Sequence, residues 1–281
     1  MEPEEYGRTA AAEDRHFWFR EARAIWHGLL RRAPREPSAM SPAGPPNSKQ
    51  SPPESPRRRL ILDAGCGTGG NLRAIEEAST FPGGHPGSDG MRSRPPLNQG
   101  AIGLDLSPIA LGLARGRVGS PLVRGSVLAL PFRDQSFDLA LCADVLYHVE
   151  VRDDLAALRE LRRVLRPGGL LCVNVPAFDS LRSAHDRAMH TARRYTRGSL
   201  RARLINAGFA PCRVLYWNGL LLLPAVIVRL FRRGGEGSEI GMPPPGLNAL
   251  LWLLARCDAA LALAGLLPAG LSVAALARRK D

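Results

Sequence analysis

Cysteine and lysine are scarce in this chain of 281 residues, and no internal repeat is visible. Only Lys49 and Lys280 are lysines, so arginine carries almost all of the formal net charge of +12. The five cysteines form no C-x-x-C pair and mostly fall in apolar segments; they are Cys66, Cys142, Cys172, Cys212 and Cys257. This pattern argues against a disulfide framework and against a zinc site, and it favours a reducing compartment.

The sequence also lacks an apolar N-terminal segment and a long unbroken apolar run. Residues 1–5 are acidic, so no secretory signal is expected. The uncharged stretch Val214–Val228 is shorter than the roughly 20 residues that a membrane span needs. The stretch Ala259–Ala277 is broken by Pro268-Ala269-Gly270. We therefore expect a cytoplasmic protein without a transmembrane anchor.

The most informative feature that is present is the run Ile61–Gly70. It predicts a buried strand that breaks into a glycine-rich turn, followed by a helix over 71–78. Because glycine has no Cβ, such a turn can tighten and let a ligand lie against the backbone. The helix then presents its free N–H groups to that ligand. Gly65, Gly67 and Gly70 also satisfy the pattern G-x-G-x-x-G, which alone is a weak dinucleotide signal.

Asp63, just before the first glycine, and a fixed succession of downstream segments make the signal more specific. The succession is an apolar strand 101–105, a helix start at Ser107-Pro108, the segment 125–132, a fourth strand 136–142, a helix 153–166, the stop Pro167-Gly168-Gly169 and a fifth strand 170–175. Asp105 ends the second strand, where an acid is placed to accept hydrogen bonds from two ribose hydroxyls.

Residues 59–176 resemble the class I S-adenosylmethionine-dependent methyltransferases of the small-molecule type, which share the order LPF, SFD, H and LRPGG. The resemblance implies an α/β fold, a Rossmann-like doubly wound sheet of seven strands of which six are parallel and the last is antiparallel. It implies S-adenosylmethionine as the cofactor. The residues that would bind this cofactor are Asp63, Gly65, Cys66, Gly67, Asp105, Leu106, Ser126, Val127 and Ala143. Ser126 stands where the family usually has an acid near the adenine amino group, but its hydroxyl and the N–H of Val127 can still hold the base.

The composition divides the chain into a helical lid over 1–32, a Pro- and Ser-rich disordered linker over 33–58 and a methyltransferase domain over 59–281. Within this domain, 79–100 is predicted to be a disordered surface insertion because it has no apolar periodicity. Its removal restores the spacing of about 20 residues between a glycine loop and its ribose-binding acid. Residues 178–270 are predicted to form the acceptor-binding and cap region.

The predicted lid carries a cluster of aromatic residues in the string Arg15–Arg20. In the methyltransferases that this chain resembles, an N-terminal helix of this kind closes over the cofactor. We therefore expect Trp18 to shield the methionine end of the cofactor from water. Packing alone is the alternative role of this cluster.

Arginine collects after the predicted fifth strand. Between Phe178 and Arg233 there are eleven arginines and only two acids, Asp179 and Asp186. A basic acceptor region indicates an anionic substrate or an anionic membrane surface, and a solvated face without a partner is the alternative. Nucleic acid is disfavoured as a partner because few aromatic residues are interleaved with these arginines. In addition, the fourth strand runs into 143–148 rather than into the Pro-Pro-aromatic loop of enzymes that methylate base amino groups.

The same region contains His185-Asp186, His190 and Arg193–Thr196, and one bacterial methyltransferase subgroup shows the same HD…H…RRYT string followed by Trp217-Asn218. Three interpretations stay open. In the first, His185 or His190 is a general base for an acceptor hydroxyl. In the second, the histidines bind a metal together with Asp186, although the sequence offers no further ligand cluster. In the third, the polar groups only form hydrogen bonds with one another. His148, after the fourth strand, is a weaker catalytic candidate. The residues expected to contact the acceptor are Trp18, Tyr147, Asp186, Arg193, Arg194, Tyr195 and Asn218.

Two apolar helices, about Leu220–Arg232 and Leu247–Leu266, are expected between a sixth strand over 210–216 and a seventh over 271–277. They would form a hydrophobic cap beside the acceptor site. Arginines at the ends of apolar helices also suit a membrane interface. We therefore expect either an apolar acceptor pocket or a peripheral association with the inner face of the membrane.

The sequence thus predicts a methyltransferase that acts on a small-molecule or lipid-linked acceptor of anionic or amphipathic character, with O-methylation favoured. One alternative is a nicotinamide-dependent oxidoreductase, which the glycine pattern permits. The other is a non-catalytic membrane-interface scaffold that retains the cofactor fold. No metal is expected, and the sequence leaves the oligomeric state open.

Overall fold

The computed structural model describes residues 2–33, 59–80, 99–222 and 242–281. Most of the predicted linker, most of the predicted insertion and most of the first cap helix lie outside these residues. The helices are α1 Pro3–Ala12, α2 Phe17–Arg31, α3 Gly70–Thr80, α4 Pro108–Arg115, α5 Asp154–Val164, the 3-10 turn η1 Asp179–Leu181, α6 Ala184–Ala188, α7 Arg197–Asn206 and α9 Pro245–Ala264. The strands are β1 Arg59–Ala64, β2 Gln99–Asp105, β3 Leu122–Arg124, β4 Phe137–Ala143, β5 Leu165–Pro176, β6 Phe209–Trp217 and β7 Ser272–Arg279.

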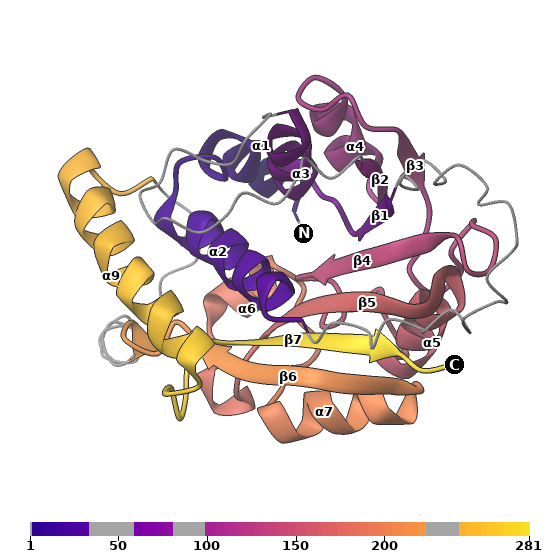
Figure 1. Ribbon diagram of the computed structural model, residues 1–281. Helices are drawn as coiled ribbons and strands as arrows, with labels where there is room; N and C mark the ends of the chain where they lie inside the picture. Colours follow the sequence, from indigo (N-terminus) through magenta and orange to yellow (C-terminus); the bar gives the residue numbers. More distant parts are fainter. Residues whose placement is uncertain (1, 34–58, 81–98, 223–241) are drawn as a thin grey trace, which may run out of the picture.

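The strands form one seven-stranded sheet in the order β3-β2-β1-β4-β5-β7-β6 (Figure 1). The pairs from β3 to β5 are parallel, whereas β7 runs antiparallel to both of its neighbours, β5 and β6. This confirms the predicted doubly wound sheet with six parallel strands and an antiparallel last strand. The order reverses between β1 and β4, which is where ligands bind in open sheets of this kind.

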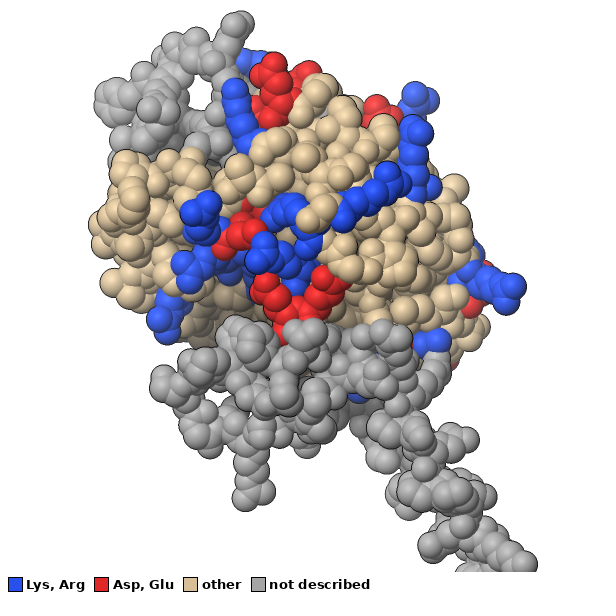
Figure 2. Space-filling view, turned by 90° about the horizontal axis from the view of Figure 1, so that it is seen from above, with Lys and Arg blue, Asp and Glu red and all other residues tan. Residues whose placement is uncertain are grey.

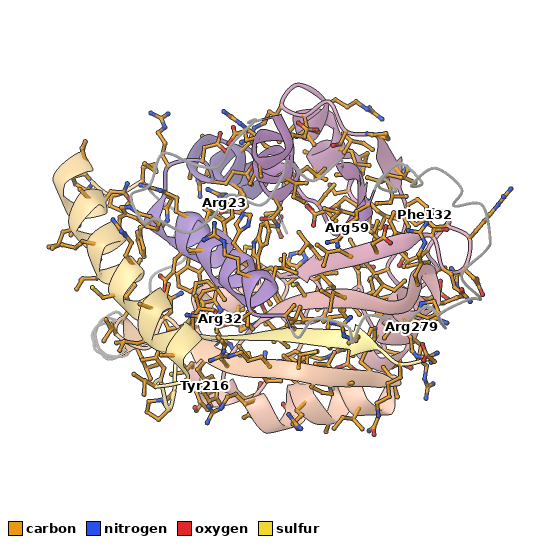
Figure 3. The ribbon with its side chains drawn as sticks, in the orientation of Figure 1. Arg23, Arg32, Arg59, Phe132, Tyr216 and Arg279 are labelled. Atoms are coloured by element: carbon orange, nitrogen blue, oxygen red, sulfur yellow. The ribbon has the colours of Figure 1, made fainter. Side chains whose placement is uncertain are left out.

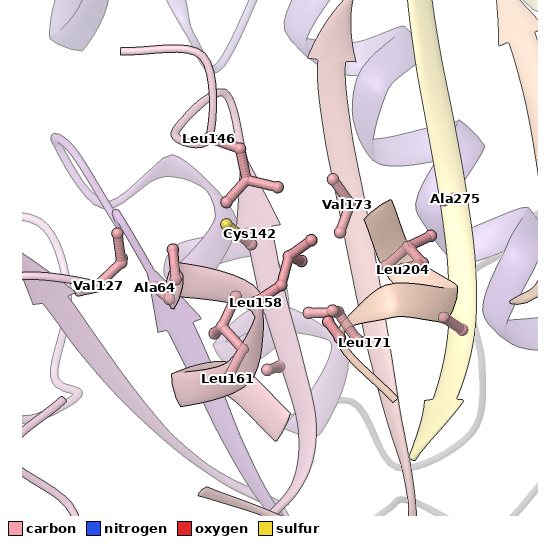
Figure 4. Close-up of a cluster of buried hydrophobic side chains, with 14 of the residues drawn as sticks. Ala64, Val127, Cys142, Leu146, Leu158, Leu161, Leu171, Val173, Leu204 and Ala275 are labelled. Atoms are coloured by element: carbon pink, nitrogen blue, oxygen red, sulfur yellow. The ribbon is translucent and has the colours of Figure 1, made fainter. Parts of the chain in front are cut away.

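Helices cover both faces of the sheet. On one face α5 and α7 pack through leucines such as Leu158, Leu161 and Leu204 against Leu171 and Val173 of β5 (Figure 4). On the other face lie α2, α3, α4 and α9, and their apolar residues form a second cluster that contains Ile25, Leu72, Leu111 and Ala262. Burial of both faces explains why the central strands read as near-continuous apolar runs rather than as alternating ones.

Several element boundaries differ from those expected. The predicted helix 153–166 ends at Val164, and Leu165 already pairs with Phe137 as part of β5. The physical reason is Pro167, because the residue before a proline is pushed toward extended backbone. The third strand, β3, covers 122–124 and so precedes the segment 125–132. The insertion is shorter than 79–100, because α3 continues to 80 and β2 begins at 99.

Helix α9 corresponds to the second predicted cap helix and packs mainly beside α2. Of the helices in the described residues, it is the one that is long and apolar enough to cross a membrane, with a mean hydropathy of 1.5 in a window that is 22% buried. Length and composition alone are weak evidence for a span.

Candidate functional site

A cavity of about 980 Å³ lies at the carboxyl ends of β1, β2, β4 and β5, beneath α1 and α2. Its lining combines the glycine loop and the ends of β2 and β4 with residues of the lid, of the segment 186–194 and of α9. It therefore occupies the point where the strand order reverses, and its volume suits one or two small molecules.

The glycine loop has the backbone that the sequence predicts. Gly65 has a φ of +89°, and a Cβ at this position would lie 2.1 Å from the side chain of Val145. Gly67 has a φ of +53°, but a Cβ there would meet nothing within 4 Å. Both residues line the cavity. The loop thus turns tightly at Gly65 and leaves open space at Gly67, which lets a ligand approach the backbone.

Asp105 links this loop to the second strand. One of its carboxylate oxygens accepts the N–H of Gly67 at 2.9 Å, and the other accepts the N–H of Ser107 at 2.8 Å. These bonds fix the carboxylate at the cavity wall. Each oxygen keeps a further lone pair for a ligand hydroxyl.

Tyr6, which the sequence reasoning missed, reaches the same corner from α1. It lines the cavity and hydrogen-bonds to the side chain of Ser107. Burial raises the pKa of its phenol, so the group stays a neutral hydrogen-bond partner. No motif marks this residue, and only the folding of α1 over α4 brings it to the site.

Asp63 lies beneath the loop rather than in the cavity wall. It is fully buried, and within the described residues neither of its carboxylate oxygens has a hydrogen-bond partner. Burial, followed by the charge of Asp105, raises its pKa to about 7. Asp63 can therefore act on a ligand only through the loop it supports or through a bridging water.

The remaining predicted cofactor residues, Cys66, Leu106, Ser126, Val127 and Ala143, all line the cavity. The hydroxyl of Ser126 accepts the N–H of Leu128 at 3.2 Å, so it already shapes the turn after β3.

The turn between α1 and α2 clamps the lid onto the glycine loop. Glu13 accepts a hydrogen bond of 2.7 Å from the hydroxyl of Thr68 and pairs with the guanidinium of Arg117. Gly70 allows this approach, because a Cβ there would lie 2.3 Å from a Glu13 carboxylate oxygen. Arg23 of α2, labelled in Figure 3, donates to the carbonyl of Glu13 at 2.8 Å. The lid is therefore bonded to the residues that surround the loop.

Asp144 is the second site residue that the sequence reasoning missed. It follows β4 with a φ of +60°, lines the cavity and accepts the side-chain amide of Asn174 at 3.0 Å. The residue is exposed to the open cavity. The protein atoms crowded around its carboxylate partly desolvate it and raise its pKa to about 6, against the opposing effect of the Asn174 hydrogen bond. The sequence does contain a signal for this residue, because an acid directly follows β4, next to the point where the strand order reverses.

Tyr147, His148 and His190 also line the cavity, and the two histidine rings lie 5.7 Å apart. The Nδ1 atom of His148 accepts the N–H of Glu150 at 3.2 Å. Burial lowers the pKa of His148 to about 4. At neutral pH its proton thus sits on Nε2, which can donate but cannot take a proton.

His190 contacts Glu2 of the lid through Nε2 at 2.9 Å. The third histidine, His185, lies in α6, and its side chain is outside the described residues. The prediction for His185 therefore falls outside the described side chains. His190 joins the segment 186–194 to the start of α1.

Both arginines of the RRYT string bind to other groups of the protein. Arg194 and Asp186 form a buried ion pair at 2.8 Å in the cavity wall. Arg193 does not line the cavity and donates to the carbonyls of Leu146, Val151 and Arg152. These contacts fit the interpretation in which the polar groups of the string bond to protein groups.

Two further predicted acceptor residues point elsewhere. Tyr195 is buried and donates to Asp154 at 2.9 Å. Asn218 is fully buried beside α9, and its backbone N–H donates to Asp258 at 2.7 Å. The lid residue Trp18 does line the cavity, and its ring lies 5.4 Å from that of Trp217. Among the described residues, no group of three or more potential ligands could hold a metal ion.

Comparison with known proteins places this site in context. A sequence profile described as a methyltransferase domain matches residues 87–173, which include β2 to most of β5. A protein of Encephalitozoon cuniculi whose name contains the word methyltransferase is 36% identical over 120 residues, 42% of this chain and 46% of that protein. The malonyl-[acyl-carrier protein] O-methyltransferase of Dechloromonas aromatica is 33% identical over 158 residues, 53% of this chain and 51% of that enzyme. The chain thus spans about half the length of these curated relatives.

Solved structures agree in fold. A geranyl diphosphate C-methyltransferase of Streptomyces coelicolor, crystallised with S-adenosylhomocysteine, has a TM-score of 0.51 at 15% identity and covers 79% of this chain and 69% of its own. An S-adenosylmethionine-dependent methyltransferase of Mesorhizobium loti has a TM-score of 0.50 at 20% identity and covers 79% of this chain and 91% of its own. At these identities the likeness establishes the fold.

Proposed function

We propose that this chain, which has the fold of the class I methyltransferases and matches a methyltransferase-domain profile over residues 87–173, is an S-adenosylmethionine-dependent methyltransferase of a small-molecule or lipid-linked amphipathic acceptor. Oxygen is the favoured methylated atom. The observation that carries the proposal is one cavity whose wall contains the glycine loop, Asp105 and Asp144.

The loop end of the cavity fits S-adenosylmethionine. The carboxylate of Asp105 is positioned for ribose hydroxyls by its bonds to Gly67 and Ser107. The open space at Gly67 gives room for the ligand against the backbone. In the described part of the chain the buried carboxyl of Asp63, below the loop, has no hydrogen-bond partner. A ligand ammonium reached through a water would compensate its charge. The cofactor, when bound, supplies a methyl group on a sulfonium, which is already a good leaving group.

Asp144 is the best-placed group to accept a proton from an acceptor hydroxyl. It lies at the end of β4 in the cavity, and its pKa of about 6 keeps it ionised at neutral pH. As the acceptor oxygen gains the methyl group, its proton passes to the Asp144 carboxylate. A base with a pKa near the working pH contributes about 10²–10⁴ to such a step. His148 cannot take this role while its Nδ1 accepts from Glu150.

The wall of the cavity is mainly apolar. Trp18, Met189 and Leu251 contribute to it. The guanidinium of Arg194 is already neutralised by Asp186. The arginines in this wall thus give little support to a strongly anionic acceptor, and an amphipathic acceptor with a hydroxyl is the better match. Walls of this kind also exclude water and align the reactants.

The relatives do not identify the acceptor. One is named for an acyl-carrier-protein ester, whereas a Mus musculus relative named for tRNA methylation is 31% identical over 121 residues, 22% of its own length. We do not include nucleic acid among the proposed partners, because Arg193 and Arg194 of the acceptor region are bonded to protein groups.

The test is incubation of the purified protein with methyl-labelled S-adenosylmethionine and a host extract. The products are then separated into lipid, aqueous, protein and nucleic-acid fractions. We expect label in the lipid or the aqueous fraction, absent with Asp105→Ala. Label in nucleic acid or protein would replace the proposed acceptor class. Binding of NAD in preference to S-adenosylmethionine, or cofactor binding without methyl transfer to any fraction, would overturn the proposal.

A further inference from the structure

The large apolar residues of α9 face outward, while its small residues face the protein. Ala255, Ala259 and Ala262 are buried. The outward set, here called the leucine face, comprises Leu247, Leu250, Leu253 and Leu254, with exposed fractions of 48, 54, 58 and 39%. Their spacing of three or four residues places them on one side of the helix. In water this arrangement is the reverse of the usual amphipathic pattern.

The orientation of α9 is fixed by specific contacts. At its first turns the side chain of Asn248 accepts the N–H of Phe17 at 3.1 Å and donates to the carbonyl of Arg15 at 3.0 Å. Near its end Leu263 lies so close to Gly28 of α2 that a Cβ on this glycine would be 2.2 Å from it. The helix therefore cannot roll to bury its leucines without losing contacts at both ends.

The margin of the leucine face is cationic. Arg256 is exposed, and the guanidinium of Arg20 stacks over the ring of Trp252 at 3.9 Å. The charge of Arg256, after the effect of burial, lowers the pKa of Arg20, which shows that the two cations are neighbours. The one acid within α9, Asp258, is buried. Figure 2 shows this side of the molecule at its left edge, with uncharged residues bordered by Lys and Arg.

We propose that the leucine face of α9 docks the protein onto the surface of an anionic lipid bilayer. Leucines that enter the acyl region, with tryptophan and arginine at headgroup level, are the chemistry of helices that lie in a membrane interface. The helix would lie along the membrane rather than cross it, because Asn248 and Asp258 hold its other side to the protein. The basic net charge of +12 draws the protein to anionic headgroups.

Charge favours a bilayer over a second copy of this chain. A two-fold contact would bring the same patch of each copy together. The cations Arg20 and Arg256 at one margin would then face like charges, whereas anionic headgroups neutralise them. The same margin accounts for a preference for anionic over neutral lipid.

The docking surface and the cavity share α9. Leu251 lines the cavity, while its neighbour Leu250 faces outward. Resting on the proposed function, this placement means that an amphipathic acceptor reaches the cavity from the bilayer to which the protein is docked. The bilayer would thus be both the anchor and the source of the acceptor.

The experiment measures flotation of the full chain with phosphatidylcholine vesicles, with and without phosphatidylglycerol. We expect flotation with the anionic vesicles, weakened about tenfold in the double variant Leu250→Gln/Leu253→Gln. The matched control is Ile205→Gln, which changes an equally exposed residue on α7. Arg256→Gln should weaken flotation only with the anionic vesicles. Absence of flotation, or equal loss in Ile205→Gln, overturns the proposal.

A second measurement uses the wild-type chain, so its result does not depend on whether a variant folds. Cys257 is an exposed cysteine on the outward side of α9, so an environment-sensitive fluorophore on it should shift to the blue with anionic vesicles. No shift, or a leucine-dependent dimer in solution without lipid, would contradict docking to a bilayer. S-adenosylmethionine binding is measured separately without lipid. If S-adenosylmethionine still binds while flotation fails, the docking proposal is wrong and the proposed function is unaffected. If flotation occurs while S-adenosylmethionine does not bind, the proposed function is wrong and the docking proposal is unaffected.

Discussion

The side chain of Asn174 holds the Asp144 carboxylate with one end and the indole of Trp217 with the other. Its amide nitrogen donates to Asp144 at 3.0 Å, and its amide oxygen accepts the Trp217 N–H at 2.9 Å. The ring of Trp217 in turn lies against Trp18 of the lid. The lid and the acidic end of the cavity are therefore joined through one asparagine.

If Asp144 is the general base, Asp144→Asn should lower kcat by about 10²–10⁴ and leave the affinity for S-adenosylmethionine unchanged. For the wild type, kcat/KM should rise with pH through about 6, because the carboxylate must be ionised to accept a proton. Asn174→Ala removes a hydrogen bond that lowers the pKa of Asp144. The inflection of this variant should therefore move to higher pH. A pH profile that does not move in Asn174→Ala would contradict the role of Asp144.

Asp105 should contribute to cofactor binding. Asp105→Ala removes an acceptor for ribose, the bond to the Gly67 N–H of the glycine loop and the bond to the Ser107 N–H at the start of α4. We expect the Kd for S-adenosylmethionine, measured by calorimetry, to rise by at least about tenfold, the effect of one charged hydrogen bond. The control is Asp134→Ala, which changes a surface acid paired with Arg163. Equal affinity in Asp105→Ala and in the control would count against the cofactor site.

Gly70 should control the clamp between the lid and the glycine loop. In Gly70→Ala the new methyl group would collide with the Glu13 carboxylate, so this flexible side chain must leave Thr68 and Arg117. We expect weaker cofactor binding and faster proteolysis within residues 2–33, while the global unfolding midpoint changes little. Glu13→Gln should reproduce both effects in weaker form.

The matched control for Gly70→Ala is Gly112→Ala on α4, where a Cβ meets nothing within 4 Å. Alanine in a helix interior stabilises by about 0.5–1 kcal/mol relative to glycine, so this variant should be at least as stable as the wild type. If both variants bind cofactor equally well and resist proteolysis equally, the clamp does not contribute to binding.

The sequence was sufficient to predict the sheet, through its resemblance to a known fold, and to predict that the glycine loop and Asp105 lie together, because these features depend on local patterns. Apolar strands, glycines with positive φ and an acid at a strand end are visible within a few residues, as at Gly67 and Asp105. The acceptor end depends on contacts distant in sequence. Whether Arg193 faces a substrate or the carbonyl of Val151 is decided by the packing of two segments 42 residues apart. Composition cannot distinguish these outcomes.

Helix α9 shows a second limit of sequence reasoning. Its apolar composition predicted a cap, and the helix is present, but the pattern did not reveal that leucines would face outward and alanines inward. That orientation depends on the contacts of Asn248 in α9 with Arg15 and of Leu263 in α9 with Gly28 of α2. These residues are far apart in the sequence, so no local pattern shows that they meet. The same is true of Tyr6, because nothing near it in sequence points to Ser107.

The buried acid Glu21 of α2 should make stability depend on pH. It has no exposed surface, and within the described residues its oxygens have no hydrogen-bond partner of good geometry. Burial, and then the charge of Asp258, raise the pKa of Glu21 from 4.5 to about 10. Asp258 itself accepts the N–H groups of Asn218 and Leu220, both at 2.7 Å. At neutral pH Glu21 is therefore a neutral acid beside Asp258, packed between α2, α9 and the end of β6.

The sign of the pH effect follows from proton linkage. Between pH 4.5 and about 10 the unfolded chain releases the proton of Glu21, while the folded chain keeps it. The unfolded state then binds fewer protons, so the free energy of unfolding falls as pH rises, by up to about 1.4 kcal/mol per pH unit. In Glu21→Gln the neutral amide cannot release a proton, so this slope should disappear and the variant should gain stability relative to the wild type with rising pH. Urea unfolding across this window measures both slopes, with the exposed Glu77→Gln as the control. Parallel pH dependence in wild type and Glu21→Gln would show that Glu21 is not held protonated in the folded protein.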